Sequence, residues 1–363
     1  MFLTRYPVEG ASSRYRVFQY LPHLRARGLD CTVQSFMDGE LYALGQMPGR
    51  TLRKAWATLK ASWRRIRAVA AHGRYDVVYM QRELLPFGPP VLERWMARRG
   101  TPLLFDYDDA LFIKKASRYN PLATLLRAPE KTFEIFKLVG CVVAGNNWLR
   151  DQALQNGAKR AETVEVAEDT GRIPMRAVSG PSQPVTIGWL GSPSTAKYLH
   201  LIGPVLGKLA SRHPDLRFEL VGSGEFHMEG VPWVLTPWSL QNELDALARF
   251  DVGLMPLPLE DWARGKSGGK ARTYMAAGVV PVCTGIGYNL ELIEHGRTGF
   301  LCVDERDWLD ILEELVDDAA LRRRVAVAAR AEVVSRFDPG KQADALASLI
   351  QETARLRACA RRD

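Results

Sequence analysis

The stretch from Gly265 to Gly278, GKSGGKARTYMAAG, places glycines and two lysines at the expected start of a helix. Glycine lets the backbone approach a ligand closely, and a helix N-terminus presents N–H groups to an anion. Lys266 and Lys270 would add positive charge, and the backbone of residues 267–269 would supply further donors. The pattern therefore predicts a site for a phosphate or diphosphate group.

Two other loops follow expected strands and contain small residues. In GWLGSPST, Gly191 and Ser192 precede a helix whose first turn holds Lys197, an arrangement that suits a diphosphate. The same loop also fits an ordinary capped turn, because Ser and Thr are favoured N-caps. Gly222, between Val221 and Gly224, has a weaker pattern, since two glycines after a buried strand often serve only the turn.

These loops need strands and helices to position them, and the chain is long enough for two domains. Its 363 residues exceed one ordinary core, and 47% apolar with 25% charged residues is typical of a folded globular protein. Short β-rich runs alternate with helical stretches, as in parallel sheets covered by helices on both faces. We therefore expect an α/β fold of two doubly wound, Rossmann-like domains, with ligands in a cleft at the carboxyl ends of the strands.

A polar segment containing Pro and Gly, from Asp169 to Pro184, interrupts the alternation. We therefore expect an N-terminal domain over residues 1–170 and a C-terminal domain over 171–335, with a helix over 336–363 packing back towards the first domain. The expected strands are Cys31–Phe36, Asp76–Met80, Pro102–Asp106, Cys141–Ala144, Val185–Leu190, Arg217–Val221, Val231–Leu235, Val252–Met255, Val279–Cys283 and Gly299–Val303. The expected helices are Val17–Arg27, Gly49–Ala70, Pro90–Arg99, Ala128–Leu138, Ala196–Ser211, Gln241–Ala248, Lys270–Ala277, Asp307–Asp318 and Ala319–Ser335.

Charge is unevenly distributed along the chain. Residues 1–180 carry 28 Lys and Arg against 17 Asp and Glu, whereas residues 181–363 carry 21 against 24, which together give the net charge of +8. A basic first half suggests an acidic partner, either a nucleic acid or an anionic membrane surface.

The expected helix Gly49–Ala70 favours the membrane. Leu52, Trp56, Leu59, Trp63 and Ile66 fall on one stripe, and no acid occurs between residues 41 and 75. A basic amphipathic helix with two tryptophans has the composition of an interfacial membrane helix. Packing of the stripe against the sheet is the alternative. The basic residues expected to meet lipid are Arg53, Lys60 and Arg64.

Other features of the sequence indicate the cellular compartment of the protein. No run approaches the roughly 20 apolar residues of a membrane span, and the N-terminus lacks the features of a secretory signal. The five cysteines are scattered without a Cys-x-x-Cys pair, and the histidines show no metal-ligand spacing. We expect a cytoplasmic protein, peripheral at the inner face of the plasma membrane, with no metal or cofactor.

From Asp251 to Leu301 the chain resembles the donor-binding region of the family 4 retaining glycosyltransferases, which have the GT-B fold. The residues that carry the likeness are MAAG, the following VPV, and IEHGRTGFL. SSRYRVFQYLPHLRARG resembles the first loop and helix of that family, and LLFDYDDALF and GWLGSPSTAKYL resemble a bacterial branch that builds surface glycans. The resemblance implies that the C-terminal domain binds a nucleotide-diphosphate sugar and that no metal is needed.

The sequence departs from the family at three positions. The family usually has two glutamates eight positions apart around the donor loop, where this chain has Gly265 and Thr273. An arginine next to the loop glycine is replaced by Ser192. The usual glutamate contact to sugar or ribose is therefore lost, and Glu291, which matches another family glutamate, could replace some of it.

The run from Asp106 to Asp109 has the Asp-x-Asp spacing of the metal–diphosphate motif in the other large glycosyltransferase fold. A metal site here would duplicate the donor features of the second half. The resemblance instead places this loop near the acceptor, where Asp108 and Asp109 could orient or deprotonate a hydroxyl. Helix capping by Asp109 is the structural alternative.

The sequence thus predicts two sets of binding residues. Those expected at the donor are Gly191, Ser192, Lys197, Gly222, Glu243, Lys266, Ser267, Gly268, Gly269, Lys270, Thr273 and Glu291. Those expected near the acceptor or the donor phosphates, in or after a small-residue loop, are Ser12, Ser13, Arg14 and Arg16.

The predicted function is transfer of a sugar from a nucleotide-diphosphate donor to a hydroxyl of a glycan or lipid-linked acceptor in cell-surface polysaccharide synthesis. Nucleic acid is not expected as a partner. Two alternatives stay open: a sugar-nucleotide epimerase of the same fold, and a catalytically silent donor-binding or scaffold subunit, which the missing glutamate pair would favour.

Overall fold

The computed structural model describes residues 1–47, 49–113, 128–176 and 184–360, and the chain forms two compact units. The N-terminal unit comprises Met1–Ala167 and Pro339–Asp363, and the C-terminal unit comprises Glu168–Asp338. These divisions fall three residues from each expected domain boundary. Within the expected linker, residues 177–183 lie outside the described residues.

The N-terminal unit is built on a parallel sheet in the order β2-β1-β3-β4-β5-β6. Its strands are β1 (Phe2–Thr4), β2 (Val33–Ser35), β3 (Val78–Gln81), β4 (Leu103–Tyr107), β5 (Cys141–Ala144) and β6 (Ala161–Thr163). The order reverses between β1 and β3, and in such sheets ligands bind beyond the carboxyl ends of the strands at that point. The strands expected from the sequence did not include β1 and β6.

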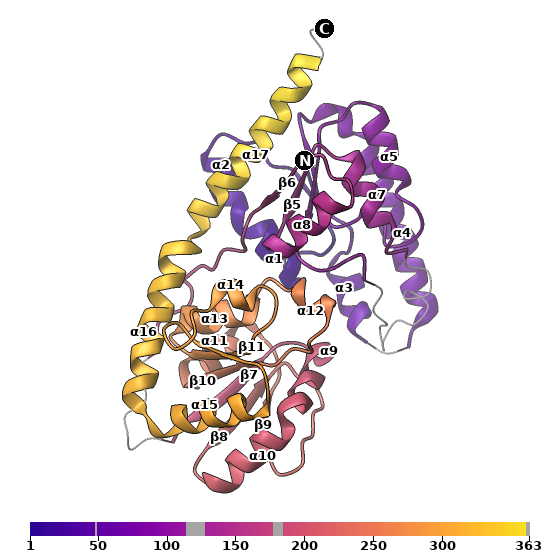
Figure 1. The fold of residues 1–363 in the computed structure, drawn as a ribbon. Coiled ribbons are helices and arrows are strands. Elements are labelled where there is room, and N and C mark those ends of the chain that lie inside the picture. The colour runs from indigo at the N-terminus through magenta and orange to yellow at the C-terminus, as the bar shows by residue number, and fades with distance from the viewer. Residues whose placement is uncertain (48, 114–127, 177–183, 361–363) are drawn as a thin grey trace. The chain divides into compact units, whose positions relative to one another are not determined.

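Helices cover this sheet, and one of them is α17, the last helix of the chain (Figure 1). They are α1 (Ala11–Arg16), η1 (Phe18–Tyr20), α2 (Leu21–Ala26), α3 (Gly39–Gln46), α4 (Thr51–Ala70), η2 (His72–Arg74), α5 (Val91–Arg98), α7 (Lys131–Leu138), α8 (Asn147–Gln155) and α17 (Pro339–Ala360). Helix α17 packs on α2 and η1, where Leu346 and Ile350 join the core around Tyr20 and Leu24. An ion pair of Arg27 with Asp344 also holds it.

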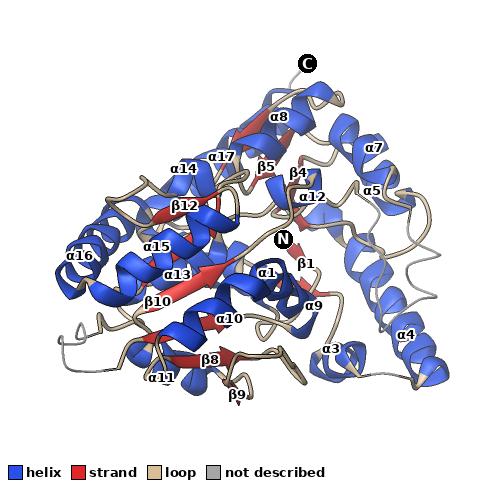
Figure 2. Cartoon of the chain, turned by 60° about the horizontal axis from the view of Figure 1, so that its bottom comes forward, coloured by secondary structure: helices blue, strands red, loops and turns tan. Residues whose placement is uncertain are grey.

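The C-terminal unit has a second parallel sheet in the order β12-β11-β10-β7-β8-β9, flanked by helices (Figure 2). Its strands are β7 (Thr186–Leu190), β8 (Arg217–Val221), β9 (Trp233–Thr236), β10 (Val252–Met255), β11 (Val280–Thr284) and β12 (Phe300–Cys302). Its helices are α9 (Pro193–Ala196), η3 (Lys197–Ile202), α10 (Gly203–Arg212), α11 (Leu240–Arg249), α12 (Asp261–Arg264), α13 (Gly269–Ala277), α14 (Asn289–Leu292), α15 (Glu305–Asp317) and α16 (Ala319–Arg336). The strand order reverses between β7 and β10, as in dinucleotide-binding folds.

Two apolar clusters form the core of this unit. One includes side chains of α10 and α15, and the other includes side chains of α11 and α13. Central strands such as VGLM of β10 are buried along their whole length, which is typical of a parallel sheet covered on both faces. The predicted fold class, an α/β chain of two doubly wound units, is confirmed.

Two predicted helices are interrupted at prolines. The expected helix Ala196–Ser211 consists of α9, η3 and α10, and α10 carries a proline, Pro204, in its first turn. The expected helix Val17–Arg27 likewise consists of η1 and α2, with Pro22 in the first turn of α2. Proline has no N–H to continue a preceding helix, so it starts a new one instead.

Candidate functional site

The lysine loop lies between α12 and α13. Lys266 precedes α13, and Lys270 is the second residue of that helix. Gly268 caps α13 in the left-handed conformation, with φ of 64°. A Cβ at this residue would lie 2.8 Å from side-chain atoms of Tyr288 and Leu292. Only glycine therefore fits both the backbone and the packing here.

Helix α13 is anchored at the point where the strand order reverses. The Tyr274 hydroxyl donates to the carbonyl of Leu254 at 3.2 Å and accepts from the N–H of Leu190 at 3.1 Å. Leu254 lies in β10, and Leu190 ends β7. Tyr274 thus fixes α13 against the carboxyl ends of these two strands, where ligands bind in this type of sheet.

The glycine loops after β7 and β8 lie against each other at the same edge. A Cβ at Gly222 would be 2.3 Å from the carbonyl oxygen of Gly191, and Gly222 has φ of 78°. A Cβ at Gly191 would in turn be 2.7 Å from Cε of Lys270. The structure therefore brings Gly191, Gly222 and Lys270, three of the residues expected at the donor, close together.

Three lysines of this edge lie over aromatic rings. Nζ of Lys270 is 5.0 Å from the centre of the Trp189 ring, and Nζ of Lys266 is 4.1 Å from that of Trp262. Lys197, exposed at the start of η3, lies 5.3 Å from the Tyr198 ring, which is itself 5.6 Å from Trp262. An aromatic face attracts an ammonium group but leaves its charge uncancelled. The rings can therefore hold cations ready for an anion.

Lys270 shows the electrostatic cost of this arrangement. Burial, with a smaller contribution from the charge of Lys266, lowers its pKa to about 8. The described polar contact of its Nζ is a long one, 3.4 Å to Oγ1 of Thr195. A bound anion would relieve both the desolvation and the repulsion between the lysines, so this is the point of the unit best suited to a phosphate.

A carboxylate approaches α13 from outside the helix. Thr273, which stands where a glutamate was expected from the resemblance, is buried and donates from Oγ1 to Oε2 of Glu168 at 3.0 Å. The same carboxylate lies 3.8 Å from Nε of the buried Arg272. Thr273 therefore does not face an open donor site, which corrects its predicted role as a direct contact.

The other predicted donor residues differ in position. Glu243 accepts from Nε1 of Trp238 at 2.6 Å, and its charge acts on Glu168 and Tyr274. Ser192 is exposed, with its Oγ 2.8 Å from Oγ of Ser194. Glu291 is exposed on α14, the helix that packs against Gly268 through Leu292. The hydrogen bonds described for Glu243 and Ser192 are thus with neighbouring residues and not with the lysines of the loop.

In the N-terminal unit, Asp108 is already engaged. Oγ of Ser12 lies 2.9 and 2.8 Å from its two oxygens, and Nη2 of Arg82 donates to it at 3.3 Å. Arg82 also pairs with Asp109 at 3.7 Å and has φ of 67°, a strained backbone for a non-glycine residue. Ser12 and the two aspartates thus come together, around an arginine that the sequence reasoning missed.

Two residues predicted at the acceptor are structural. Arg16 is buried, and its Nε donates to both oxygens of Asp106 at 3.1 and 3.0 Å. Burial opposes the charge of Arg16, but the Asp106 carboxylate outweighs it and raises the pKa of the guanidinium. Ser13 is buried and donates to Oε1 of Gln81 at 2.7 Å. Arg14 contacts the carbonyl of Glu9 at 3.2 Å and the ring of Tyr15.

Helix α4 turns its aromatic stripe outward. The five apolar residues from Leu52 to Ile66 are between 39% and 88% exposed. The opposite face, with Ala61, Arg65 and Val69, is buried. The alternative that the stripe packs on the sheet is therefore wrong. Of the basic residues, Lys60 is exposed, Arg53 pairs with Glu40, and Arg64 pairs with Asp38.

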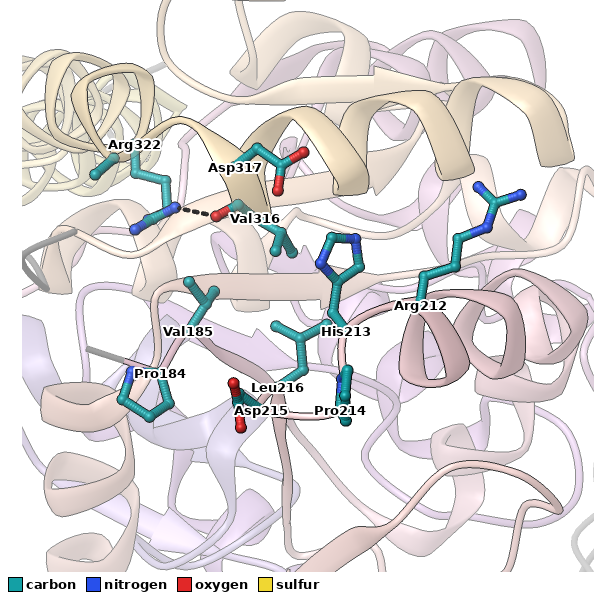
Figure 3. Close-up of a pocket in the computed structure, with 11 residues that line it drawn as sticks. Pro184, Val185, Arg212, His213, Pro214, Asp215, Leu216, Val316, Asp317 and Arg322 are labelled. Atoms are coloured by element: carbon teal, nitrogen blue, oxygen red, sulfur yellow. Dashed lines mark hydrogen bonds between the residues drawn. The ribbon is translucent and has the colours of Figure 1, made fainter. Parts of the chain in front are cut away.

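A cavity of about 350 Å³ lies elsewhere in the C-terminal unit (Figure 3). Its lining includes Val185 and residues 213–216, which precede β7 and β8, so it opens at the amino ends of the strands. Arg322, at its edge, donates to the carbonyls of Leu315 and Val316 at the end of α15. Arg322 thus caps the C-terminal end of α15. The cavity lies at the amino ends of the strands, the edge of the sheet opposite to the lysines.

Of the residues that the sequence did not predict, one lies close in the chain to the group it contacts and two lie far from theirs. Trp262 lies four positions before Lys266, a spacing that suggests a contact on one face of a turn. Glu168 and Arg82 lie far along the chain from the groups they bind, and no spacing rule connects them. Among the described residues, no cluster of three or more His, Cys, Asp or Glu side chains could hold a metal ion, and no described helix is long and apolar enough to cross a membrane.

Part of the chain matches a family of known proteins. Residues 184–318, which run from just before β7 into the loop after α15, match the family described as Glycosyl transferases group 1. No curated protein matches the whole sequence closely enough to count as a relative.

Solved structures match both units. The structure of HepE from Anabaena in complex with UDP has 17% sequence identity and a TM-score of 0.67, covering 97% of this chain and 99% of that one. Sucrose-phosphate synthase from Thermosynechococcus elongatus has 14% identity and a TM-score of 0.68, covering 97% and 98%. A glycosyltransferase from Rickettsia africae has 14% identity and a TM-score of 0.67, covering 97% of each chain. At these identities the likeness shows the fold, which is that of GT-B glycosyltransferases.

Proposed function

We propose that this protein transfers a sugar from a nucleotide-diphosphate donor, bound by the C-terminal unit, to a hydroxyl of a glycan or lipid-linked acceptor. The observation that carries the proposal is the set of lysines at the carboxyl edge of the second sheet. Lys270, Lys266 and Lys197 lie over aromatic rings beside the glycine loops after β7 and β8. The match of this unit to Glycosyl transferases group 1 supports the same reaction class.

The lysines suit the chemistry of a leaving diphosphate. When the bond between the sugar and the diphosphate breaks, negative charge develops on the diphosphate oxygens. Fixed cations at that position stabilise the charge most as it develops, because they need no rearrangement. The N–H groups at the start of α13 add to the same field. Transfer with retention of configuration, membership of family 4, and a role in surface-glycan synthesis rest on the sequence resemblance.

Calorimetry with UDP tests the donor site, since UDP is the nucleotide in the structure of HepE. We expect Lys270→Ala to weaken UDP binding about 10- to 100-fold, the value of one charge-assisted contact. The matched control is Lys208→Ala, an exposed lysine on α10. Equal affinities of the wild-type protein and Lys270→Ala for UDP, and for every other nucleoside diphosphate tried, would rule out the donor site.

Turnover separates the remaining alternatives. A transferase releases nucleoside diphosphate from the donor sugar only when acceptor is present, whereas an epimerase converts the donor without one. A silent donor-binding subunit would bind nucleotide and release nothing with any acceptor extract.

We also propose that α4 lies on an anionic membrane surface, where a lipid-linked acceptor would be found. Its exposed stripe includes Trp56 and Trp63, at 71% and 62% exposure, and Lys60 and Arg67 are exposed beside it. Tryptophan favours the membrane interface, and lysine and arginine add about 1 kcal/mol each near anionic lipid.

Vesicle flotation tests this docking. We expect Trp56→Ser/Trp63→Ser to reduce binding to vesicles containing phosphatidylglycerol at least tenfold, whereas Trp238→Ser, an exposed tryptophan of the other unit, should not. Binding that is the same on neutral vesicles, or a stripe that instead drives self-association in sedimentation, would contradict the membrane assignment.

A further inference from the structure

Glu168 is a buried acid that the proposed reaction does not yet use. It is the first residue of the C-terminal unit, 3% exposed, and its N–H donates to the carbonyl of Phe337 at 2.9 Å. Its carboxylate contacts two consecutive residues of α13, Arg272 and Thr273. Burying a charged carboxylate this deeply costs free energy unless the charge is paired or hydrogen-bonded. Glu168 therefore needs a partner that its charge stabilises.

Arg272 connects this carboxylate to the donor loop. Its guanidinium is 1% exposed, with Nε 3.8 Å from Oε2 of Glu168. Nη1 of the same side chain donates to the carbonyl of Ser267 at 3.0 Å. Ser267 lies between Lys266 and the glycines that begin α13. The path from carboxylate to loop thus takes one side chain and two polar contacts, all within the C-terminal unit.

Thr273 gives the carboxylate a fixed orientation. Its Oγ1 donates to the same oxygen of Glu168 that faces Arg272, at 3.0 Å. Arg272 also lies over the ring of Phe337, 5.3 Å from its centre, so the guanidinium is held from two sides. An arginine fixed in this way can hold a loop carbonyl in one position.

We propose that Glu168 is a positioning residue for the donor loop, acting through Arg272 and Thr273 to hold Ser267 and the start of α13 in the geometry that binds diphosphate. The expected effect on nucleotide affinity rests on the proposed function. The expected effect on the position of the loop does not. Glu168 does not contact the nucleotide in this role.

The proposal also makes nucleotide affinity depend on pH. Burial raises the pKa of Glu168 to about 7, while Arg272 and the Thr273 hydroxyl lower it, the Glu243 charge raises it and Arg172 lowers it. As pH rises through that value the carboxylate gains charge and attracts Arg272 more strongly, so the loop is held better. The affinity for nucleotide should therefore increase between pH 5.5 and 7.5, a range below the pKa of Lys270.

Hydrogen–deuterium exchange of the nucleotide-free protein tests the positioning directly. We expect Glu168→Gln, which keeps the shape and loses the charge, to speed exchange of the amides of residues 267–270 about tenfold at pH 7.5. Glu229→Gln, an exposed glutamate of the same unit, should leave them unchanged. Unchanged exchange in Glu168→Gln would overturn the proposal, whatever the protein binds.

UDP calorimetry supplies the functional half of the test. Relative to Glu229→Gln, Glu168→Gln should lose about tenfold in affinity at pH 7.5 and little at pH 5.5, which a merely structural residue would not do. The double variant Glu168→Ala/Thr273→Glu moves the carboxylate from residue 168 to residue 273 on α13, with slightly less total side-chain volume. It should recover most of the UDP affinity that is lost in Glu168→Ala. A pH-independent loss in Glu168→Gln would overturn the positioning role. If the wild-type protein does not bind UDP but Glu168→Gln still speeds hydrogen–deuterium exchange of residues 267–270, only the proposed function is contradicted.

Discussion

Two charged sites, one in each unit, are held in opposite ways. In the N-terminal unit, Arg16 is neutralised by Asp106, and Asp108 is held by Ser12 and Arg82. In the C-terminal unit, Lys270 lies over a tryptophan ring, and the charge of Lys266 acts on it unfavourably. The first arrangement stabilises the fold, whereas the second would be completed by the anion that we propose it binds. Charges that are satisfied internally are poor candidates for chemistry, and charges held without neutralisation are good ones.

The difference predicts a large stability effect at Arg16. Replacing it with Met leaves Asp106 buried without its cation, and removal of one partner of a buried pair costs about 3–5 kcal/mol. Arg14→Met, on the same helix but with a half-exposed guanidinium, should cost about 0.5 kcal/mol or less. Urea unfolding measures both. Similar midpoints for the two variants would show that the Arg16 pair is not stabilising.

Asp108→Asn tests whether the acceptor-side carboxylate is structural. The amide keeps one acceptor for Ser12 but loses the charge facing Arg82, so we expect a loss of about 2 kcal/mol in unfolding free energy. UDP affinity should stay within a factor of two. If stability is unchanged while turnover is lost, Asp108 is the base that the sequence suggested.

The affinity for UDP should fall at high pH because of Lys270. With a pKa of about 8 in the ligand-free protein, the lysine is mostly uncharged at pH 9, which reduces affinity about tenfold between pH 7 and 9, or about 1.4 kcal/mol. Arginine remains charged throughout, so Lys270→Arg should give a flat profile over this range. A wild-type profile that is also flat would show that Lys270 does not meet the phosphates.

Lys270→Met should slightly stabilise the protein without nucleotide. The pKa of Lys270 is lower in the folded protein than in the unfolded chain, so its charge destabilises the fold below pH 8. This penalty disappears as pH rises from 8 towards 10.5, where the unfolded lysine also loses its proton. We expect a gain of about 1 kcal/mol at pH 7, measured by thermal unfolding, and none at pH 10.5. A loss of stability at pH 7 would mean that an internal partner already satisfies the lysine.

Local sequence was enough to bring together the residues of the lysine loop, but not the residues around Asp108. Lys266, Lys270 and Gly268 lie within five residues of each other, so their proximity follows from connectivity. Asp108 directly follows β4, but its partners come from distant parts of the chain, Ser12 from α1 and Arg82 from just after β3. Arg16 was predicted at the acceptor because it follows a small-residue loop, yet the helix turns it inward to Asp106. A one-residue difference in helix phase rotates a side chain by about 100°, which spacing alone does not resolve.

The sequence by itself determined that the chain forms two parallel α/β sheets, that glycines and lysines lie together at the start of α13, and that a basic helix carries a tryptophan stripe. These features depend on periodicity and on residues close together in the chain. Only the tertiary structure decided that the stripe on α4 is exposed, that Thr273 holds a buried acid, and that this acid is Glu168, 105 positions earlier. The physical reason is that contacts between distant segments are set by how helices pack on the sheets, and packing is cooperative over the whole core.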